Sequence, residues 1–143
     1  MKTILFVCIH NSARSQMAEA FTRAYGSERF IAFSAGIEPG KLNPIVVQAM
    51  AEKGIDISGQ PCRSVEQHLA EQGAPDIVVT VCDEASAERC PAFNVPVQRL
   101  HWGFADPSAL AGSDAEKLAR TRVIRDEISA RIQAFCTGDF RAE

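Results

Sequence analysis

Two short stretches of the sequence are almost entirely apolar, and each runs directly into a cysteine. Ile4–Val7 precedes Cys8, and "DIVVTV", from Asp76 to Val81, precedes Cys82. A strand with one face in water alternates apolar and polar residues, whereas a strand covered on both faces is apolar throughout. These stretches therefore predict buried strands of a parallel sheet that has helices on both faces.

Strand and helix signals alternate along the whole chain. Besides Lys2–Val7 and Asp76–Val81, strands are predicted at Arg29–Phe33, ended by Ser34-Ala35-Gly36, and at Val95–Leu100. Helical spacing of apolar residues, together with end signals, predicts helices over 15–24, 44–53, 65–70 and 115–135. No repeat or linker interrupts the pattern, so residues 1–143 are expected to form a single α/β domain.

The composition excludes several classes of function. The net charge is −3 and the pI is about 5.6, so no basic surface for nucleic acid or anionic lipid is expected. No apolar run approaches the roughly 20 residues that cross a bilayer, and the first residues lack a signal-peptide cleavage site. We expect a cytoplasmic protein that binds neither nucleic acid nor a membrane.

The five cysteines are an odd number and are widely spaced, which argues against a framework of structural disulfides. The chain has no CxxC pair and no histidine at ligand spacing, so we expect no metal site. The three histidines are expected in loops or on the surface: His10, His68 and His101.

The segment "CIHNSARS" joins the end of the first strand to the start of a helix. Backbone N–H groups and the helix dipole favour an anion at such a junction, and the planar guanidinium of Arg14 suits a tetrahedral oxyanion. The same positive field stabilises a thiolate on Cys8, to which Ser15 can donate a hydrogen bond. The alternative is a buried, inert Cys8 and a surface Arg14, but CX5RS between a strand and a helix is rare by chance. The candidate oxyanion-binding loop contains Ile9, His10, Asn11, Ser12, Ala13, Arg14 and Ser15.

Four segments resemble the arsenate reductases that are built on the low-molecular-weight protein tyrosine phosphatase fold. They are "CIHNSARSQMAEA", "VTVCD", "HWGFADP" and "RVIRDEISARI". The resemblance extends from about Lys2 to Phe135. It implies a four-stranded parallel sheet of order 2-1-3-4, which agrees with the alternation of strands and helices.

The resemblance assigns roles to matching residues. Cys8 is the nucleophile, Arg14 is the oxyanion clamp, and Asp106 protonates the leaving oxygen. Cys82 and Cys90 are the two further redox cysteines. Residue types alone would favour an ordinary turn at Asp106-Pro107 and two structural thiols, although the connecting "DEASAER" is charged and small. Cys62 and Cys136 match no catalytic position and are interpreted as packing or incidental thiols.

The implied reaction is the reduction of arsenate to arsenite, as part of arsenic detoxification. Cys8 attacks arsenate, and a Cys8–Cys82–Cys90 disulfide relay is regenerated by an external thiol. The expected donor is thioredoxin, with glutaredoxin and glutathione as the other route. Phosphate and sulfate should compete with arsenate because they share its tetrahedral geometry. No bound metal or organic cofactor is expected.

Two other functions remain open at this point. A phosphatase that forms a phosphocysteine would need Cys8, Arg14 and Asp106 alone, but Ser108 and Ala109 stand where phosphatases of this fold usually carry aromatic residues. A non-enzymatic protein that binds arsenite or a soft metal through three cysteines would not need the anion-binding loop. The seven residues between Cys82 and Cys90 exceed the connection in some reductases.

One further difference from the resembling family concerns a potassium ion that some of its members hold near the loop. Asn11, Glu19 and Ser34 match three of the ligands, whereas Arg63 falls where the fourth, an aspartate, would be. A guanidinium in place of an anionic ligand should exclude the ion. We predict that Arg63 pairs with Glu19 and that Asn11 still braces the loop.

Overall fold

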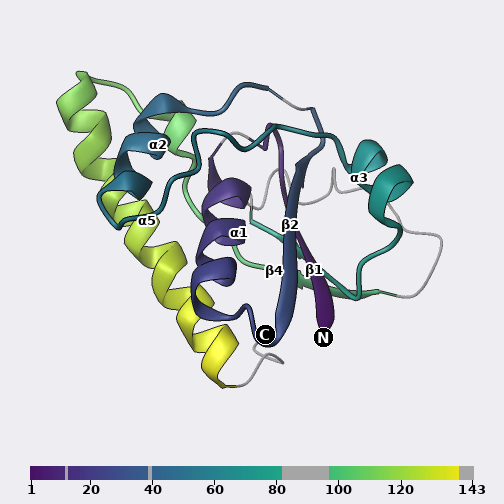
Figure 1. Cartoon of the computed structure of the whole chain (residues 1–143). Coiled ribbons are helices and arrows are strands. Elements are labelled where there is room, and N and C mark those ends of the chain that lie inside the picture. The colour runs from purple at the N-terminus through teal and green to yellow at the C-terminus, as the bar shows by residue number, and fades with distance from the viewer. Residues whose placement is uncertain (12, 39, 82–96, 139–143) are drawn as a thin grey trace.

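The computed structural model describes residues 1–11, 13–38, 40–81 and 97–138, and its sheet contains four parallel strands in the order β2-β1-β3-β4 (Figure 1). The strands are β1 (Lys2–Cys8), β2 (Phe30–Gly36), β3 (Ile77–Thr80) and β4 (Gln98–His101). The parallel pairing and the strand order are confirmed. Val95 and Pro96, the start of the predicted fourth strand, lie outside the described residues.

The helices cover both faces of the sheet, as the apolar strands predicted. α1 (Arg14–Tyr25), α2 (Pro44–Ala51) and α5 (Asp114–Thr137) lie on one side, and α3 (Val65–Gln72) lies on the other (Figure 1). A single 3-10 turn, η1 (Pro107–Ala109), follows β4. Within the described ranges, none of these helices combines the length and apolar character needed to span a membrane.

Each face of the sheet has its own hydrophobic core. The residues of β1 alternate between the two cores: Ile4 and Phe6 point to the side of α1, α2 and α5, and Leu5 and Val7 point to the side of α3. Successive side chains of a strand point to opposite faces. Because both faces are covered, every position from Ile4 to Val7 is fully buried, which explains the continuous apolar run.

The helices begin where side chains can cap them. Asn43 accepts a hydrogen bond from Ile45 N at the start of α2, and Ser64 accepts one from Gln67 N at the start of α3. Ser113 and Glu116 form a reciprocal capping box at the start of α5. These caps explain why the predicted helix starts at residues 44, 65 and 115 lie within one residue of the observed starts.

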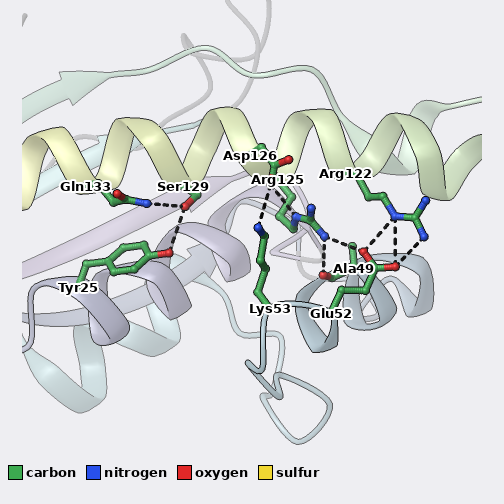
Figure 2. A network of polar contacts seen from close by, with 9 residues as sticks. All are labelled: Tyr25, Ala49, Glu52, Lys53, Arg122, Arg125, Asp126, Ser129 and Gln133. Carbon is green, nitrogen blue, oxygen red and sulfur yellow. Dashed lines mark hydrogen bonds and ion pairs between the residues drawn. The ribbon is translucent and has the colours of Figure 1, made fainter.

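A group of charged side chains fixes α2 to α5 (Figure 2). Glu52 follows α2 and pairs with both Arg122 and Arg125 of α5, with shortest N–O distances of 2.7 and 2.8 Å. These hydrogen bonds lower the pKa of Glu52 to about 2, chiefly through Arg122. Arg125 Nη1 also donates to the carbonyl oxygen of Ala49, at 2.9 Å. The position of α2 is therefore set by the longest helix of the described chain.

Two predictions about local structure are wrong. Ser34-Ala35-Gly36 does not end the second strand: β2 continues to Gly36, which pairs with Cys8. Small residues usually favour a turn, but here they allow the strand to run close beside the Cys8 loop. His68 is not on the surface: its side chain is fully buried on the inner face of α3, where it lies against Phe33 with ring centroids 4.9 Å apart.

Candidate active site

The Cys8 thiol lies at the carboxyl end of the central strand β1, where it is 2% exposed. Its Sγ is 2.9 Å from Ser15 Oγ, and Asn11 Nδ2 donates to the same hydroxyl oxygen at 2.8 Å. Because the amide of Asn11 uses a lone pair of that oxygen, the Ser15 O–H remains free to donate to sulfur. The contact between Cys8 and Ser15 that the sequence predicted is therefore present, with Asn11 holding the serine.

The loop after Cys8 is held by its carbonyl groups. The carbonyl oxygens of Cys8, Ile9 and His10 accept hydrogen bonds from the N–H groups of Ile37, Glu38 and Gly40. The N–H of a trans peptide points opposite to its carbonyl. The N–H groups that follow these three carbonyls therefore point away from the 37–40 segment. Such a set of amides is the donor array that an oxyanion needs.

Asn11 is the main brace of this loop. It is buried and has a left-handed backbone, with φ of 54°, which asparagine tolerates better than most residues. Its Oδ1 accepts from Arg63 N at 3.0 Å and from Gln16 Nε2 at 3.3 Å, while its Nδ2 holds Ser15. The predicted bracing role of Asn11 is confirmed. Ser12 lies outside the described residues.

Gly36 allows the second strand to approach the loop. A Cβ at this position would lie 2.8 Å from Asn11 N, 2.9 Å from the carbonyl carbon of His10 and 2.9 Å from Ile9 O. All three atoms belong to the backbone, so no side-chain rotation can relieve the contact. The loop conformation therefore depends on the absence of a side chain at the end of β2.

The start of α1 faces the same site. The helix begins at Arg14, and Ala13, its N-cap residue, provides no side-chain hydrogen bond to the first turn. Helix N-termini carry unpaired N–H groups and a partial positive charge, which together favour an anion. The helix dipole is therefore directed at the junction that contains Cys8.

Arg14 and Asp106 lie together beside the loop. Arg14 is 4% exposed, and its Nη1 donates to the carbonyl oxygen of Phe104 at 3.1 Å. Its Nη2 is 3.5 Å from Asp106 Oδ2. Its buried Nε has no hydrogen-bond partner within the described part of the chain, so the guanidinium keeps a donor for a ligand. A fixed cation and a carboxyl group thus share one site, although they are about 90 residues apart in the sequence.

Cys82 and Cys90 lie outside the described residues. Before Cys82, strand β3 runs beside β1, and Thr80 pairs with Val7. The N–H of Val81 donates to the carbonyl oxygen of Val7 at 2.9 Å. The chain therefore leaves the sheet at the edge where β1 ends in Cys8. The pairing of the three thiols remains a prediction.

The three residues that the resemblance suggested as potassium ligands already have partners within the chain. Glu19 is buried, and its two carboxylate oxygens contact the Ser34 hydroxyl and the Arg23 guanidinium, each at 2.5 Å. The Oδ1 of Asn11 already has two N–H donors. Burial raises the pKa of Glu19, whereas Ser34, Arg23 and Arg63 act against that rise. Two cationic side chains therefore act on the Glu19 carboxylate, Arg23 by direct contact and Arg63 through its charge.

The predicted partner of Arg63 is wrong. Arg63 Nη1 pairs with Glu71 Oε1 of α3 at 2.8 Å, and Glu19 pairs with Arg23 instead. Arg23 lies one helical turn after Glu19 on α1, so it reaches the carboxylate more directly. No group of three or more His, Cys, Asp or Glu side chains in ranges 1–11, 13–38, 40–81 and 97–138 is arranged to hold a metal ion.

Cys62 belongs to the surroundings of the site, which the sequence did not indicate. Its thiol donates to the carbonyl oxygen of Asn11 at 3.2 Å, and burial and the neighbouring Cys8 raise its pKa. No spacing motif links Cys62 to the loop, because the contact arises from the parallel bridge between Gly36 and Ser64. Cys136 is buried in the core on the side of α1, α2 and α5, as its interpretation as a packing thiol requires.

The single tyrosine lies away from the loop. Tyr25 stacks on Phe21 within α1, and its hydroxyl is 3.3 Å from Ser129 Oγ of α5 (Figure 2). Ser108 and Ala109 follow Asp106-Pro107 in η1 and are both exposed. The two residues that follow Asp106-Pro107 therefore provide no aromatic surface on which a phenyl ring can stack.

Comparison with known proteins places this site in a family. Residues 3–138 match the low molecular weight phosphotyrosine protein phosphatase family. An arsenate reductase of Halalkalibacterium halodurans is 46% identical over 134 residues, which cover 94% of each chain. The crystal structure of an Archaeoglobus fulgidus arsenate reductase superposes with a TM-score of 0.75 at 30% identity, covering 94% of this chain and 99% of that one.

A thioredoxin-dependent arsenate reductase of Corynebacterium glutamicum is also similar, with a TM-score of 0.62 at 25% identity. The match covers 93% of this chain and 62% of that protein. The family match, over residues 3–138, includes the loop, η1 and all but the first residue of the sheet. The chain therefore belongs to the low molecular weight phosphotyrosine protein phosphatase family and, within it, to the arsenate reductases.

Proposed function

We propose that this chain reduces arsenate to arsenite, with Cys8 as the nucleophile. The observation that carries the proposal is the position of the buried Cys8 thiol, which contacts the Ser15 hydroxyl in a loop whose amides, helix dipole and Arg14 favour an oxyanion. Cys8 sulfur attacks arsenic and an oxygen of arsenate leaves as water. Asp106 supplies the proton for that oxygen, because hydroxide is a poor leaving group.

The redox step follows from the electron balance. The Cys8–arsenic bond breaks when the thiolate of Cys82 attacks the sulfur of Cys8. The electron pair of that bond goes to arsenic, which leaves as arsenite, and the two sulfurs become a disulfide. Cys90 then attacks Cys82, which frees Cys8 and leaves a Cys82–Cys90 disulfide. The position of Val81 beside Val7 supports a route from Cys82 to Cys8.

An external thiol must reduce the final disulfide. Thioredoxin is the donor we favour, because a structurally similar Corynebacterium glutamicum enzyme is thioredoxin-dependent. Glutathione with glutaredoxin is the alternative and would make Cys90 dispensable. Both donors operate in a reducing cytoplasm, where the free cysteines of this chain suggest that it acts. The proposed reaction uses no bound metal or organic cofactor.

Hydrolysis of a phosphomonoester is the second candidate, since Cys8, Arg14 and Asp106 are also the groups that such a reaction requires. The family match favours it, whereas the non-aromatic Ser108 and Ala109 after Asp106-Pro107 argue against a phosphotyrosine substrate. A protein that only sequesters arsenite is a weaker candidate, because that role gives no reason for the buried Arg14.

One comparison of two activities separates these functions. The full chain is supplied with arsenate, thioredoxin, thioredoxin reductase and NADPH, and separately with p-nitrophenyl phosphate. A reductase consumes NADPH only when arsenate is present, and Cys8→Ser abolishes that consumption. Hydrolysis of p-nitrophenyl phosphate without arsenate-dependent NADPH oxidation, with either thiol donor, would identify a phosphatase instead.

Competition by phosphate is a second test of the oxyanion loop. The amides and the guanidinium recognise tetrahedral geometry, and arsenate and phosphate share it. We expect phosphate to raise the apparent KM for arsenate and to leave kcat unchanged. If high phosphate has no effect on arsenate reduction, arsenate does not bind in the Cys8–Arg14 loop.

A further inference from the structure

The side chain of Asn43 joins two segments that are far apart in the sequence. Its Oδ1 accepts a hydrogen bond from Ile45 N at 2.9 Å and so caps α2. Its Nδ2 donates to Ser108 Oγ at 2.9 Å. An asparagine side chain can do both because it carries an acceptor and a donor on one rigid amide. The start of α2 is thereby linked to η1.

Ser108 is in turn linked to the Asp106 carboxyl group. The backbone N–H of Ser108 donates to Asp106 Oδ1 at 2.9 Å. The other oxygen of this carboxyl group faces Arg14 Nη2 at 3.5 Å. The orientation of Asp106 is therefore fixed from two sides, by the guanidinium of the oxyanion loop and by η1.

η1 packs on the molecule through the buried Pro107 and its contacts with α5, and the Asn43 bond adds a support at Ser108. It has only three residues, and a helix this short has little stability of its own. α2 can provide the support because Val46, Ala49 and Met50 bury its inner face. The end of α2 is fixed to α5 through Arg125 and Glu52, as Figure 2 shows. Asn43 thus connects a firmly anchored helix to a short turn whose last two residues, Ser108 and Ala109, are exposed.

We propose that Asn43 is a positioning residue for Asp106, acting through its hydrogen bond to Ser108. Its side chain lies outside the Cys8–Arg14 loop and bonds to Ile45 and Ser108. The inference rests on the proposed function, in which Asp106 protonates the departing oxygen. A proton donor is needed in the transition state rather than in the bound complex. Loss of the Asn43–Ser108 bond should therefore slow the chemical step and leave oxyanion binding nearly unchanged.

The experiment uses variants that remove this bond alone. Ser108→Ala deletes the hydroxyl but keeps the backbone N–H that donates a hydrogen bond to Asp106. Asn43→Ser keeps a capping oxygen for α2, because serine caps as well as asparagine, but it lacks the amide donor. Ser108→Thr retains the hydroxyl and is the conservative variant. Ser27→Ala, at an exposed turn, is the matched control.

Arsenite release is followed in a single turnover at saturating arsenate, and phosphate affinity is measured by calorimetry. Ser108→Ala and Asn43→Ser should each release arsenite about tenfold more slowly, since small displacements of a catalytic group cost about this much or more. Phosphate affinity should change less than about twofold. The double variant should be no slower than either single variant, because both changes break the same bond. Ser108→Thr and Ser27→Ala should behave as the wild type.

Several outcomes would overturn the inference. These are wild-type rates in both single variants, an additive loss in the double variant, or a loss of phosphate affinity as large as the loss of rate. If the wild-type chain releases no arsenite, the proposed function fails instead. In that case, hydrogen exchange of the Ser108 backbone N–H tests whether Asn43 supports η1. Asn43→Ser should accelerate this exchange, and an unchanged rate would show that Asn43 does not support η1.

Discussion

Gly36 is the residue on which the conformation of the oxyanion loop depends most directly. A methyl group there would press on backbone atoms of Ile9, His10 and Asn11 at 2.8 to 2.9 Å, which is closer than carbon contacts allow. We expect Gly36→Ala to reduce the free energy of unfolding by about 1–3 kcal/mol, a typical cost of overpacking. Because the displaced atoms form the loop, phosphate affinity should fall about tenfold or more, an effect of about 1.4 kcal/mol.

Gly59 offers a matched control, because an added Cβ there meets no atom within 4 Å. Thermal unfolding and calorimetric titration with phosphate of the two variants make the comparison. Gly59→Ala should resemble the wild type in both. If Gly36→Ala binds phosphate as tightly as the wild type, the close approach of β2 does not set the loop conformation.

Arg63 gives a second prediction at the scale of a residue. Of the residues that the resemblance suggested as potassium ligands, Asn11 and Glu19 already accept hydrogen bonds and the Ser34 hydroxyl already donates one to Glu19, while two guanidinium groups are nearby. Replacing sodium by potassium at constant ionic strength should therefore change neither the Tm nor the rate of arsenate reduction. Arg63→Asp restores a carboxylate at this position, and any potassium dependence should appear only in that variant. A potassium-dependent rise in the Tm of the wild-type chain would contradict this account.

At the scale of an element, α3 carries a pH-sensitive group. His68 is fully buried, and neither ring nitrogen has a hydrogen-bond partner within the described residues. Burial, with a smaller effect of Arg63, lowers its pKa below 6.5, while Glu71 acts in the opposite direction. The unfolded chain therefore binds a proton below about pH 6.5 that the folded chain does not bind. Stability should be fully present above that pH and fall as the pH decreases, by up to about 1.4 kcal/mol per pH unit.

Urea denaturation at about pH 7.5 and about pH 5.5 tests this expectation. The titration of His68 affects the free energy of unfolding at the lower pH but not at the higher one. His68→Leu should lose less stability on acidification than the wild type does. Leu69→Ala loosens the same helix without removing a titrating group, so its penalty should be similar at both pH values. An acid sensitivity in His68→Leu equal to that of the wild type would show that His68 is not the responsible group.

The elements themselves were largely predictable, because their signals are local. Continuous apolar runs gave β1 and β3, and helical spacing together with end signals gave helix starts close to those observed. The end of β2 could not be predicted, because Ser34-Ala35-Gly36 has the composition of a turn. These residues remain extended only because Cys8 pairs with Gly36 and the loop packs above it.

At the scale of the whole molecule, the limit of prediction was the pairing of distant side chains. The Cys8–Ser15 contact could be predicted because both residues belong to one motif. The pairing of Arg63 with Glu71 and the contact of Cys62 with the loop could not. These contacts depend on how α3 and the segment before it lie against β2, which no local spacing encodes.

At the same scale, we propose that Cys8, Cys82 and Cys90 form a relay that passes two electrons to arsenic and ends as a Cys82–Cys90 disulfide. The most direct test is a single turnover of the Cys90→Ser variant with arsenate and no reductant, followed by peptide mapping under non-reducing conditions. We predict release of about one arsenite per chain and a disulfide between Cys8 and Cys82, because the resolving thiol is missing. Sustained turnover of this variant with thioredoxin, or arsenite release without that disulfide, would contradict the relay.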